Sequence, residues 1–143
     1  MVNYGNGKIY KIERISDNVL LYVGSTTKEY ISQRLVEHKR MSKRKPNMRI
    51  YKSISDNNGW ENHQILLIKQ YSCTSRDELK SEEARFIRCL KPIGNQNIPM
   101  RTDREYYLDN CEKIKLSSKK HRDENPNFLT EYYNSNKERI NEY

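Results

Sequence analysis

The chain opens with two short apolar runs of the kind that form paired β-strands. The runs are rich in Ile, Val, Leu and Tyr, cover residues 8–15 and 19–24, and are separated by the polar residues 16–18. This pattern predicts a β-hairpin, and a three-residue loop pairs Ile15 with Val19. In that register Ile12 pairs with Tyr22, and one face of the sheet carries Tyr10, Ile12, Leu20 and Tyr22.

Helical spacing of the apolar positions follows after the hairpin. Thr27 is suited to cap a helix over residues 28–44, in which Ile31 and Leu35 face inward. Side chains four residues apart share a helix face, so a second stripe forms beside the apolar one. This second stripe consists of Tyr30, Arg34 and His38.

Three further elements complete the first hundred residues. A short helix is predicted over residues 48–56, ended by the polar residues 57–59, and the apolar run 63–71 is suited to a third strand. Ser75, with Glu78 three positions later, is a capping box that opens another helix. Its apolar positions Leu79, Phe86, Ile87 and Leu90 continue to a stop at Pro92. The predicted order is ββααβα.

The character of the chain changes at Arg101, where Gly disappears, apolar residues become sparse and an internal repeat begins. The segment that starts at Glu105-Tyr106-Tyr107 matches the segment that starts at Glu131-Tyr132-Tyr133, at a constant offset of 26 residues. We expect two polar helices interrupted near Pro126, packed lightly on the preceding domain or partly disordered. The predicted domains are residues 1–100 and a helical tail over 101–143.

Composition limits the size and the partners of the protein. A chain of 143 residues has room for one ordinary domain and a short appendage, and a mean hydropathy of -1.09 predicts a small core. The net charge of +8 favours a polyanionic partner. Lys and Arg outnumber Asp and Glu by 18 to 10 over residues 1–100 and balance at 9 to 9 over 101–143. The excess charge therefore lies in the predicted domain.

The sequence contains neither a membrane-spanning run nor a signal-peptide pattern, so we expect a soluble, intracellular protein, cytoplasmic or at a host genome, and not a secreted one. Three cysteines, with no Cys-x-x-Cys spacing, indicate reduced thiols rather than disulfides or a zinc site: Cys73, Cys89 and Cys111.

Glu83 is the most unusual position in the predicted helices. It is inserted in the stripe of Leu79, Phe86 and Leu90, where a carboxylate is costly unless a cation neutralises it. The candidate cations are a divalent metal, Arg34 or Arg85. One interpretation is therefore a metal ligand, and the other is half of a structural salt bridge. Arg34 is likewise either a site residue or a solvated helix charge.

Five segments in series resemble the GIY-YIG nuclease superfamily in order and spacing. They are Lys8-Ile9-Tyr10, then Tyr22-Val23-Gly24, then Arg34-x-x-x-His38, then Glu83, then Pro92-x-x-Asn95. The resemblance covers about residues 7–97. Lys8 stands where the family has Gly, and we expect this difference to shift the start of the strand without removing the chemistry. Asn95, rather than Asn97, matches the family by its spacing from Pro92.

The resemblance implies an α+β fold, with a small three-stranded antiparallel sheet flanked by helices. It also implies a DNA endonuclease that hydrolyses phosphodiester bonds with an activated water and one Mg²⁺ or Mn²⁺ held by Glu83. Arg34 stabilises charge on the phosphate. Tyr10 and Tyr22 orient the water, and Tyr10 is favoured as the base if Arg34, His38 or the metal lowers its pKa.

The same resemblance assigns supporting roles. His38 hydrogen-bonds a phosphate or a tyrosine hydroxyl, although a neutral packing role is equally consistent with the sequence. Gly24 lets the backbone approach the nucleic acid at the edge of the site. Asn95 hydrogen-bonds the loop beneath the metal site.

A run of basic residues without an acidic one follows the candidate catalytic helix positions. It comprises Lys39, Arg40, Lys43, Arg44, Lys45, Arg49 and Lys52, and we interpret it as a surface that grips phosphates without reading sequence. The partner implied is duplex or branched DNA. Two alternatives remain: a non-catalytic nucleic-acid-binding module with the same fold, and a scaffold that acts through its repeat tail. The sequence leaves the oligomeric state open.

Overall fold

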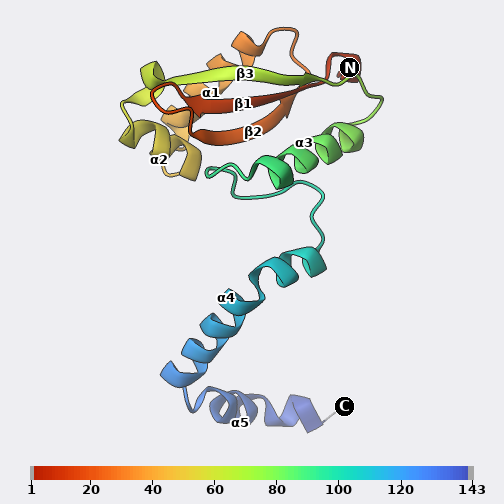
Figure 1. The fold of residues 1–143 in the computed structure, drawn as a ribbon. Helices are drawn as coiled ribbons and strands as arrows, with labels where there is room; N and C mark the ends of the chain where they lie inside the picture. Colours follow the sequence, from red (N-terminus) through yellow and green to blue (C-terminus); the bar gives the residue numbers. More distant parts are fainter. Residues whose placement is uncertain (1, 142–143) are drawn as a thin grey trace. The chain divides into compact units, whose positions relative to one another are not determined.

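The computed structural model describes residues 2–141, which divide into two compact units, the first ending at Arg101 and the second beginning at Thr102. In the first unit the strands and helices follow the predicted order ββααβα (Figure 1). They are β1 (Lys8–Arg14), β2 (Leu20–Thr26), α1 (Ile31–Arg44), α2 (Arg49–Asp56), β3 (His63–Gln70) and α3 (Arg76–Leu90). Two short 3₁₀ helices, η1 (Tyr4–Asn6) and η2 (Gly59–Asn62), precede β1 and β3.

The three strands form one antiparallel sheet in the order β2-β1-β3, so the α+β class and the small antiparallel sheet are confirmed. β1 lies in the centre and pairs with both neighbours (Figure 1). The apolar side chains of β1 are fully buried, as are Leu21 and Val23 of the neighbouring β2.

A β-bulge changes the hairpin register halfway along. Ile12 pairs with Tyr22, as predicted, but Glu13 then pairs with Leu20, because Leu21 is an extra residue in β2. The predicted pairing of Ile15 with Val19 is therefore wrong. The bulge also reverses which side chains of β2 face each way, so Leu20 packs with the opposite cluster and Leu21 takes its place beside Tyr10 and Ile12.

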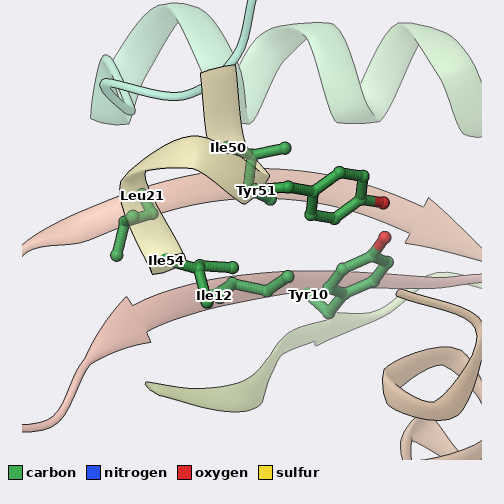
Figure 2. Packing of buried hydrophobic residues seen from close by; sticks show 6 residues of the cluster. All are labelled: Tyr10, Ile12, Leu21, Ile50, Tyr51 and Ile54. Atoms are coloured by element: carbon green, nitrogen blue, oxygen red, sulfur yellow. The ribbon is translucent and has the colours of Figure 1, made fainter. Parts of the chain in front are cut away.

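The sheet is covered on both faces by helices. One face, here called the tyrosine face, packs against α1, α2 and η2, and its buried cluster comprises Tyr10, Ile12, Leu21, Ile50, Tyr51 and Ile54. Figure 2 shows the aliphatic members at one end of this cluster and the two tyrosine hydroxyls together at the other. The opposite face packs against α3 through Ile9, Val23, Leu79 and Ile87. The buried layer on the tyrosine face is therefore apolar except at the end where the two hydroxyls lie.

The first long helix begins later than its sequence predicts. α1 starts at Ile31 with Tyr30 as its N-cap, and Thr27 is not the capping residue. The reason lies in the preceding turn, where the Thr26 hydroxyl accepts a hydrogen bond from the Lys28 backbone N–H at 3.2 Å. Ile31 packs against the core as predicted, whereas Leu35 is only half buried and belongs to neither core cluster.

α3 begins at its predicted cap, since the Ser75 hydroxyl accepts a hydrogen bond from the Glu78 backbone N–H at 3.2 Å. The Glu78 carboxylate reaches the Thr74 backbone N–H instead of closing the box on Ser75. The helix ends before Pro92, with Lys91 in the left-handed conformation. Leu90, in the last turn, is 42% exposed, so its predicted inward orientation is wrong.

The segment after α3 covers the outer edge of β2. The Gly94 backbone N–H donates to Leu21 O at 2.7 Å, and a Cβ on Gly94 would approach that oxygen to 2.6 Å. The Asn95 side chain forms the hydrogen bonds that a neighbouring strand would form. It accepts from Val23 N–H and donates to Val23 O, both at 2.9 Å. This arrangement satisfies polar groups that an edge strand otherwise exposes.

In the second unit, α4 (Asp103–Glu124) and α5 (Phe128–Asn141) flank Pro126. Each repeat contains the same side-chain hydrogen bond, since Asn110 donates to Tyr106 O and Asn136 donates to Tyr132 O, both at 2.8 Å. The structure does not describe the side chains of the repeat positions Glu138 and Ile140. Residues 142 and 143 of the predicted tail also lie outside the described residues. No described helix is both long and apolar enough to cross a membrane.

We predict that Asn95→Ala lowers the free energy of unfolding by about 2 kcal/mol, because two buried backbone groups of Val23 lose their partners. Urea unfolding measures this change. Asn97→Ala is the matched control, since Asn97 is exposed and should change stability by less than about 0.5 kcal/mol. Equal effects of the two substitutions would contradict this account of the β2 edge.

Candidate active site

Four of the side chains singled out in the sequence meet at the polar end of the tyrosine face. Tyr10 comes from β1, Tyr22 from β2, and Arg34 and His38 from successive turns of α1. The Tyr10 and Tyr22 ring centroids are 6.2 Å apart, and the His38 ring lies 5.8 Å from Tyr10 and 5.6 Å from Tyr22. Tyr30, the third member of the predicted α1 stripe, is 59% exposed and stands apart.

A chain of hydrogen bonds runs through this cluster. Arg34 Nε donates to Tyr10 Oη at 3.0 Å, Tyr10 Oη is 2.8 Å from His38 Nε2, and His38 Nδ1 is 3.1 Å from Tyr51 Oη. His38 therefore contacts tyrosine hydroxyls, which is one of its two predicted roles. At 4% exposure its ring has no access to a phosphate.

The sequence interpretation missed Tyr51, which joins the chain from α2. A signal existed, because Ile50, Tyr51 and Ile54 form the apolar face of that short helix. A tyrosine on such a face is buried, and a buried tyrosine hydroxyl requires a hydrogen-bond partner. Its partner, however, is 13 residues away and is set only by how α2 packs on α1.

The proton positions follow from the donors available. The Arg34 guanidinium can only donate, so the Tyr10 oxygen accepts from it and has its own proton left for His38 Nε2. Burial, with a smaller contribution from the Arg34 charge, lowers the pKa of His38 to about 4, so the ring is neutral at pH 7. The neutral ring contacts Tyr10 through Nε2 and Tyr51 through Nδ1, so its one proton is donated in one of these hydrogen bonds and a tyrosine hydroxyl donates in the other.

Burial also determines the acidity of the two tyrosines. It raises the pKa of Tyr22 to about 12, and the Glu83 charge raises it further. Burial also raises the pKa of Tyr10, and the Arg34 charge offsets part of this rise. Arg34 lowers the pKa of both tyrosines, as the sequence interpretation required for a tyrosine base, but desolvation outweighs it and both pKa values are raised.

Tyr10 and Tyr22 differ in how deeply they are buried. Tyr10 is fully buried and hydrogen-bonded, so it is out of reach of an attacking water in this structure. Tyr22 is only partly buried. The sequence interpretation favoured Tyr10 as the base, whereas Tyr22 is the less buried of the two tyrosines.

Gly24 makes room for both rings. It pairs with Tyr10 across the hairpin, and a Cβ at this position would lie 2.6 Å from Tyr10 Oη and 2.7 Å from Tyr22 Cε1. Gly24 itself is buried. The absence of a side chain at Gly24 lets the two tyrosines lie close together.

Glu83 is buried on α3, as its place in the apolar stripe predicts, but its partners differ from the candidates. Its Oε2 accepts hydrogen bonds from the Ser25 hydroxyl and from Lys80 Nζ, the latter at 2.7 Å. The proposed cations are engaged elsewhere: Arg34 donates to Glu37 at 2.7 Å, and Arg85 donates to Glu82 at 2.8 Å. The nearest cation is thus a lysine three residues earlier on the same helix.

The donor set at Glu83 suits a metal that needs one carboxylate. Glu83 Oε1 forms no hydrogen bond among the described residues, and the Glu83 side chain is 5% exposed. No group of three or more His, Cys, Asp or Glu side chains in the described part of the chain is placed to hold a metal alone. Mg²⁺ binds readily to one carboxylate plus waters and substrate oxygens, so Glu83 fits that ion.

The predicted basic surface is present on the outside of the same unit. Lys39, Arg40, Lys43 and Arg44 lie on the last turns of α1, followed by Lys45, Arg49 and Lys52 up to and along α2, and all are exposed. None of these side chains forms an ion pair in the part of the chain that the structure describes. Unpaired surface cations of one sign are available to neutralise phosphates.

Asn95 hydrogen-bonds the backbone of strand β2 and not the loop that the sequence interpretation assigned to it. Its side chain binds both backbone groups of Val23, the residue before Gly24. It thereby holds the strand from which Tyr22 and Ser25 project. Asn97, the alternative in the sequence, is exposed.

Comparison with protein-family models, curated proteins and solved structures found no match for this chain. The functional argument therefore depends on the geometry of the residues themselves.

The lowered pKa of His38 predicts a specific pH dependence of stability. Because the unfolded chain binds the proton at about pH 6.5 and the folded chain only near pH 4, this contribution is complete above pH 6.5 and is lost as the pH falls toward 4. It amounts to roughly 3 kcal/mol. Unfolding followed by the fluorescence of the single tryptophan, Trp60, at several pH values measures it.

His38→Gln should flatten the pH dependence of stability between pH 6.5 and pH 4, because the titrating group is gone. His121→Gln is the matched control, since His121 is exposed on α4 and its removal should leave the slope unchanged. A slope that persists in full in His38→Gln would show that His38 is not buried in the neutral form.

Proposed function

We propose that this chain is a metal-dependent endonuclease that hydrolyses phosphodiester bonds of DNA, a member of the GIY-YIG group that its motifs resemble. The observation that carries the proposal is the buried hydrogen-bond chain that holds Arg34 against Tyr10, with Tyr22 and Glu83 beside it. A fixed, partly exposed guanidinium, tyrosine hydroxyls and a carboxylate with one oxygen free of hydrogen bonds among the described residues are groups suited to phosphodiester hydrolysis.

Arg34 is the group suited to meet the scissile phosphate. Its Nε is fixed on Tyr10 and its Nη1 on Glu37, while Nη2 forms no hydrogen bond among the described residues. Burial alone would lower the pKa of Arg34, but its contacts with Tyr10 and Glu37 outweigh burial and raise it, so the positive charge is permanent. A preorganised donor of this kind stabilises the charge that develops on the phosphate in the transition state.

Tyr22 is the hydroxyl suited to position the attacking water. Its pKa of about 12 keeps it protonated at neutral pH, so it orients the water by hydrogen bonding until a neighbouring positive charge makes its proton easier to lose. Tyr10 and His38 act through Arg34 and Tyr22 as positioning residues. Glu83 would hold a Mg²⁺ or Mn²⁺, which would supply positive charge at the phosphate.

The alternative is a nucleic-acid-binding module that does not cut, and one contact favours it. Lys80 already neutralises Glu83, so the carboxylate that should hold the metal has a resident cation. Lys80 is on the surface side of this pair, with a third of its side chain exposed, and a mobile lysine is displaced more easily than a buried one. The cutting assay decides between these two functions.

We predict that the purified protein nicks supercoiled plasmid with Mg²⁺ or Mn²⁺ and does not do so in EDTA. Glu83→Gln and Arg34→Ala should each lower the nicking rate by about 100-fold or more, the usual effect of losing a metal ligand or a transition-state donor. Glu82→Gln is the matched control on α3, because Glu82 forms only surface ion pairs with Lys69 and Arg85. Its rate should stay near that of the parent chain.

Arg34→Lys tests whether cleavage requires the several N–H donors of the guanidinium or only its positive charge. A lysine keeps the positive charge but cannot bind Tyr10 and the phosphate together, so its rate should stay closer to that of Arg34→Ala than to the parent. Absence of metal-dependent nicking on plasmid and on branched DNA, with DNA binding retained, would replace the nuclease proposal with the non-cutting module.

A further inference from the structure

A hollow of about 590 Å³ opens on the first unit, between the last turns of α1, α2 and η2. Two aromatic side chains, Trp60 and Tyr51, line it, together with Lys43, Lys52, Asn47 and Asp56. The size lies within the range of pockets that hold small organic ligands. None of the roles proposed above uses this hollow.

Trp60 gives the hollow a fixed aromatic surface. It is the only tryptophan in the chain and is partly buried against the core, and its Nε1 donates to the Ser42 hydroxyl at 3.1 Å. Its ring centroid lies 6.4 Å from those of Tyr51 and His38. An aromatic ring that is already ordered offers stacking area for a nucleobase at little entropic cost.

The charge around the hollow matches a nucleic acid strand. Lys43 belongs to the basic surface, Lys52 extends it along α2, and neither forms an ion pair within the described residues. Asn47 and Asp56 add amide and carboxylate groups that suit the hydrogen-bonding edges of a base. A site with cations at its rim and aromatic rings in its wall combines the two features that bind single-stranded nucleic acid.

We propose that this hollow receives one unpaired nucleotide of a strand whose phosphates lie along the basic surface. The inference rests on the proposed function, and it assigns a substrate class to it: nucleic acid with a single-stranded or unpaired segment next to the cut. A base within a duplex is stacked and paired, so it cannot enter without being extruded, whereas an unpaired base enters freely.

The hollow is also connected to the candidate active site. Tyr51 forms part of its wall and, through its hydroxyl, holds His38, which holds Tyr10. A base seated here therefore lies against the far end of the same hydrogen-bond chain. This places the bound strand beside the residues that act on its phosphates.

The fluorescence of Trp60 tests the proposal directly, because no other tryptophan contributes. The full chain in EDTA, where no cutting is expected, is titrated with a short single-stranded oligothymidylate and with a blunt duplex of equal length. The proposal predicts saturable quenching by the single strand and at least tenfold weaker binding of the duplex, with both affinities also measured by anisotropy of labelled DNA.

Substitutions test whether single-strand binding depends on the residues that line the hollow. Lys43→Ala with Lys52→Ala, and separately Trp60→Ala, should each weaken single-strand binding by about tenfold. Arg76→Ala is the matched control, since it removes an exposed charge at the start of α3, whose contacts are with the other face of the sheet, and should leave binding unchanged. Circular dichroism of each variant checks that it is folded.

Three results would overturn the proposal. They are single-strand binding that leaves Trp60 emission unchanged, equal affinity for the duplex, and quenching by thymidine monophosphate at the concentration needed for the oligonucleotide, which would indicate a free-nucleotide site. The two proposals fail separately. Quenching of Trp60 without plasmid nicking would support nucleotide binding in the hollow and contradict the nuclease proposal. Nicking without quenching would support the nuclease proposal and contradict nucleotide binding in the hollow.

Discussion

The hydrogen-bond chain from Arg34 through Tyr10 and His38 to Tyr51 is the constraint on which the rest of the first unit depends. These polar groups lie in the layer between the sheet and its helices, where an unpaired donor or acceptor costs about 1–3 kcal/mol. Each group is satisfied by another member of the chain, so the network links β1, α1 and α2 in a single arrangement. Displacement of either helix breaks one of the bonds.

Burial of this network sets the electrostatics of the candidate site. His38 is held neutral and both tyrosines are held protonated, so Arg34 is the permanent cation next to the tyrosine face. Arg34 pairs with Glu37 and Glu83 pairs with Lys80, both at 2.7 Å, so each charge has a counter-ion on its own helix. The Glu83 charge is close enough to raise the pKa of Tyr22.

The local patterns that the sequence contains were enough to predict much of this arrangement. Hairpin periodicity put Tyr10 and Tyr22 on one face, and helical spacing put Arg34 and His38 on one stripe. The bulge at Leu21 was not predictable in this way, because an extra residue in β2 is favoured only by how Leu21 packs on α2. Contacts between elements are set by tertiary packing, which no periodicity encodes.

The same limit applies to the chemistry of the site. The stripe position of Glu83 predicted a buried carboxylate, but its partners Ser25 and Lys80 depend on how α3 docks on β2. The role of Tyr51 and the pairing of Asn95 with Val23 likewise depend on contacts distant in sequence. The pKa directions of the tyrosines followed from burial depth, which is known only once the layers are assembled.

The most direct test of the account is the single-turnover rate of DNA cleavage in Tyr22→Phe, measured beside its unfolding free energy. The account predicts a chain as stable as the parent whose cleavage rate falls by about 100-fold, since Tyr22 is the tyrosine proposed to position the water. Cleavage at the parental rate in Tyr22→Phe would contradict it and would return the role of activating hydroxyl to the buried Tyr10.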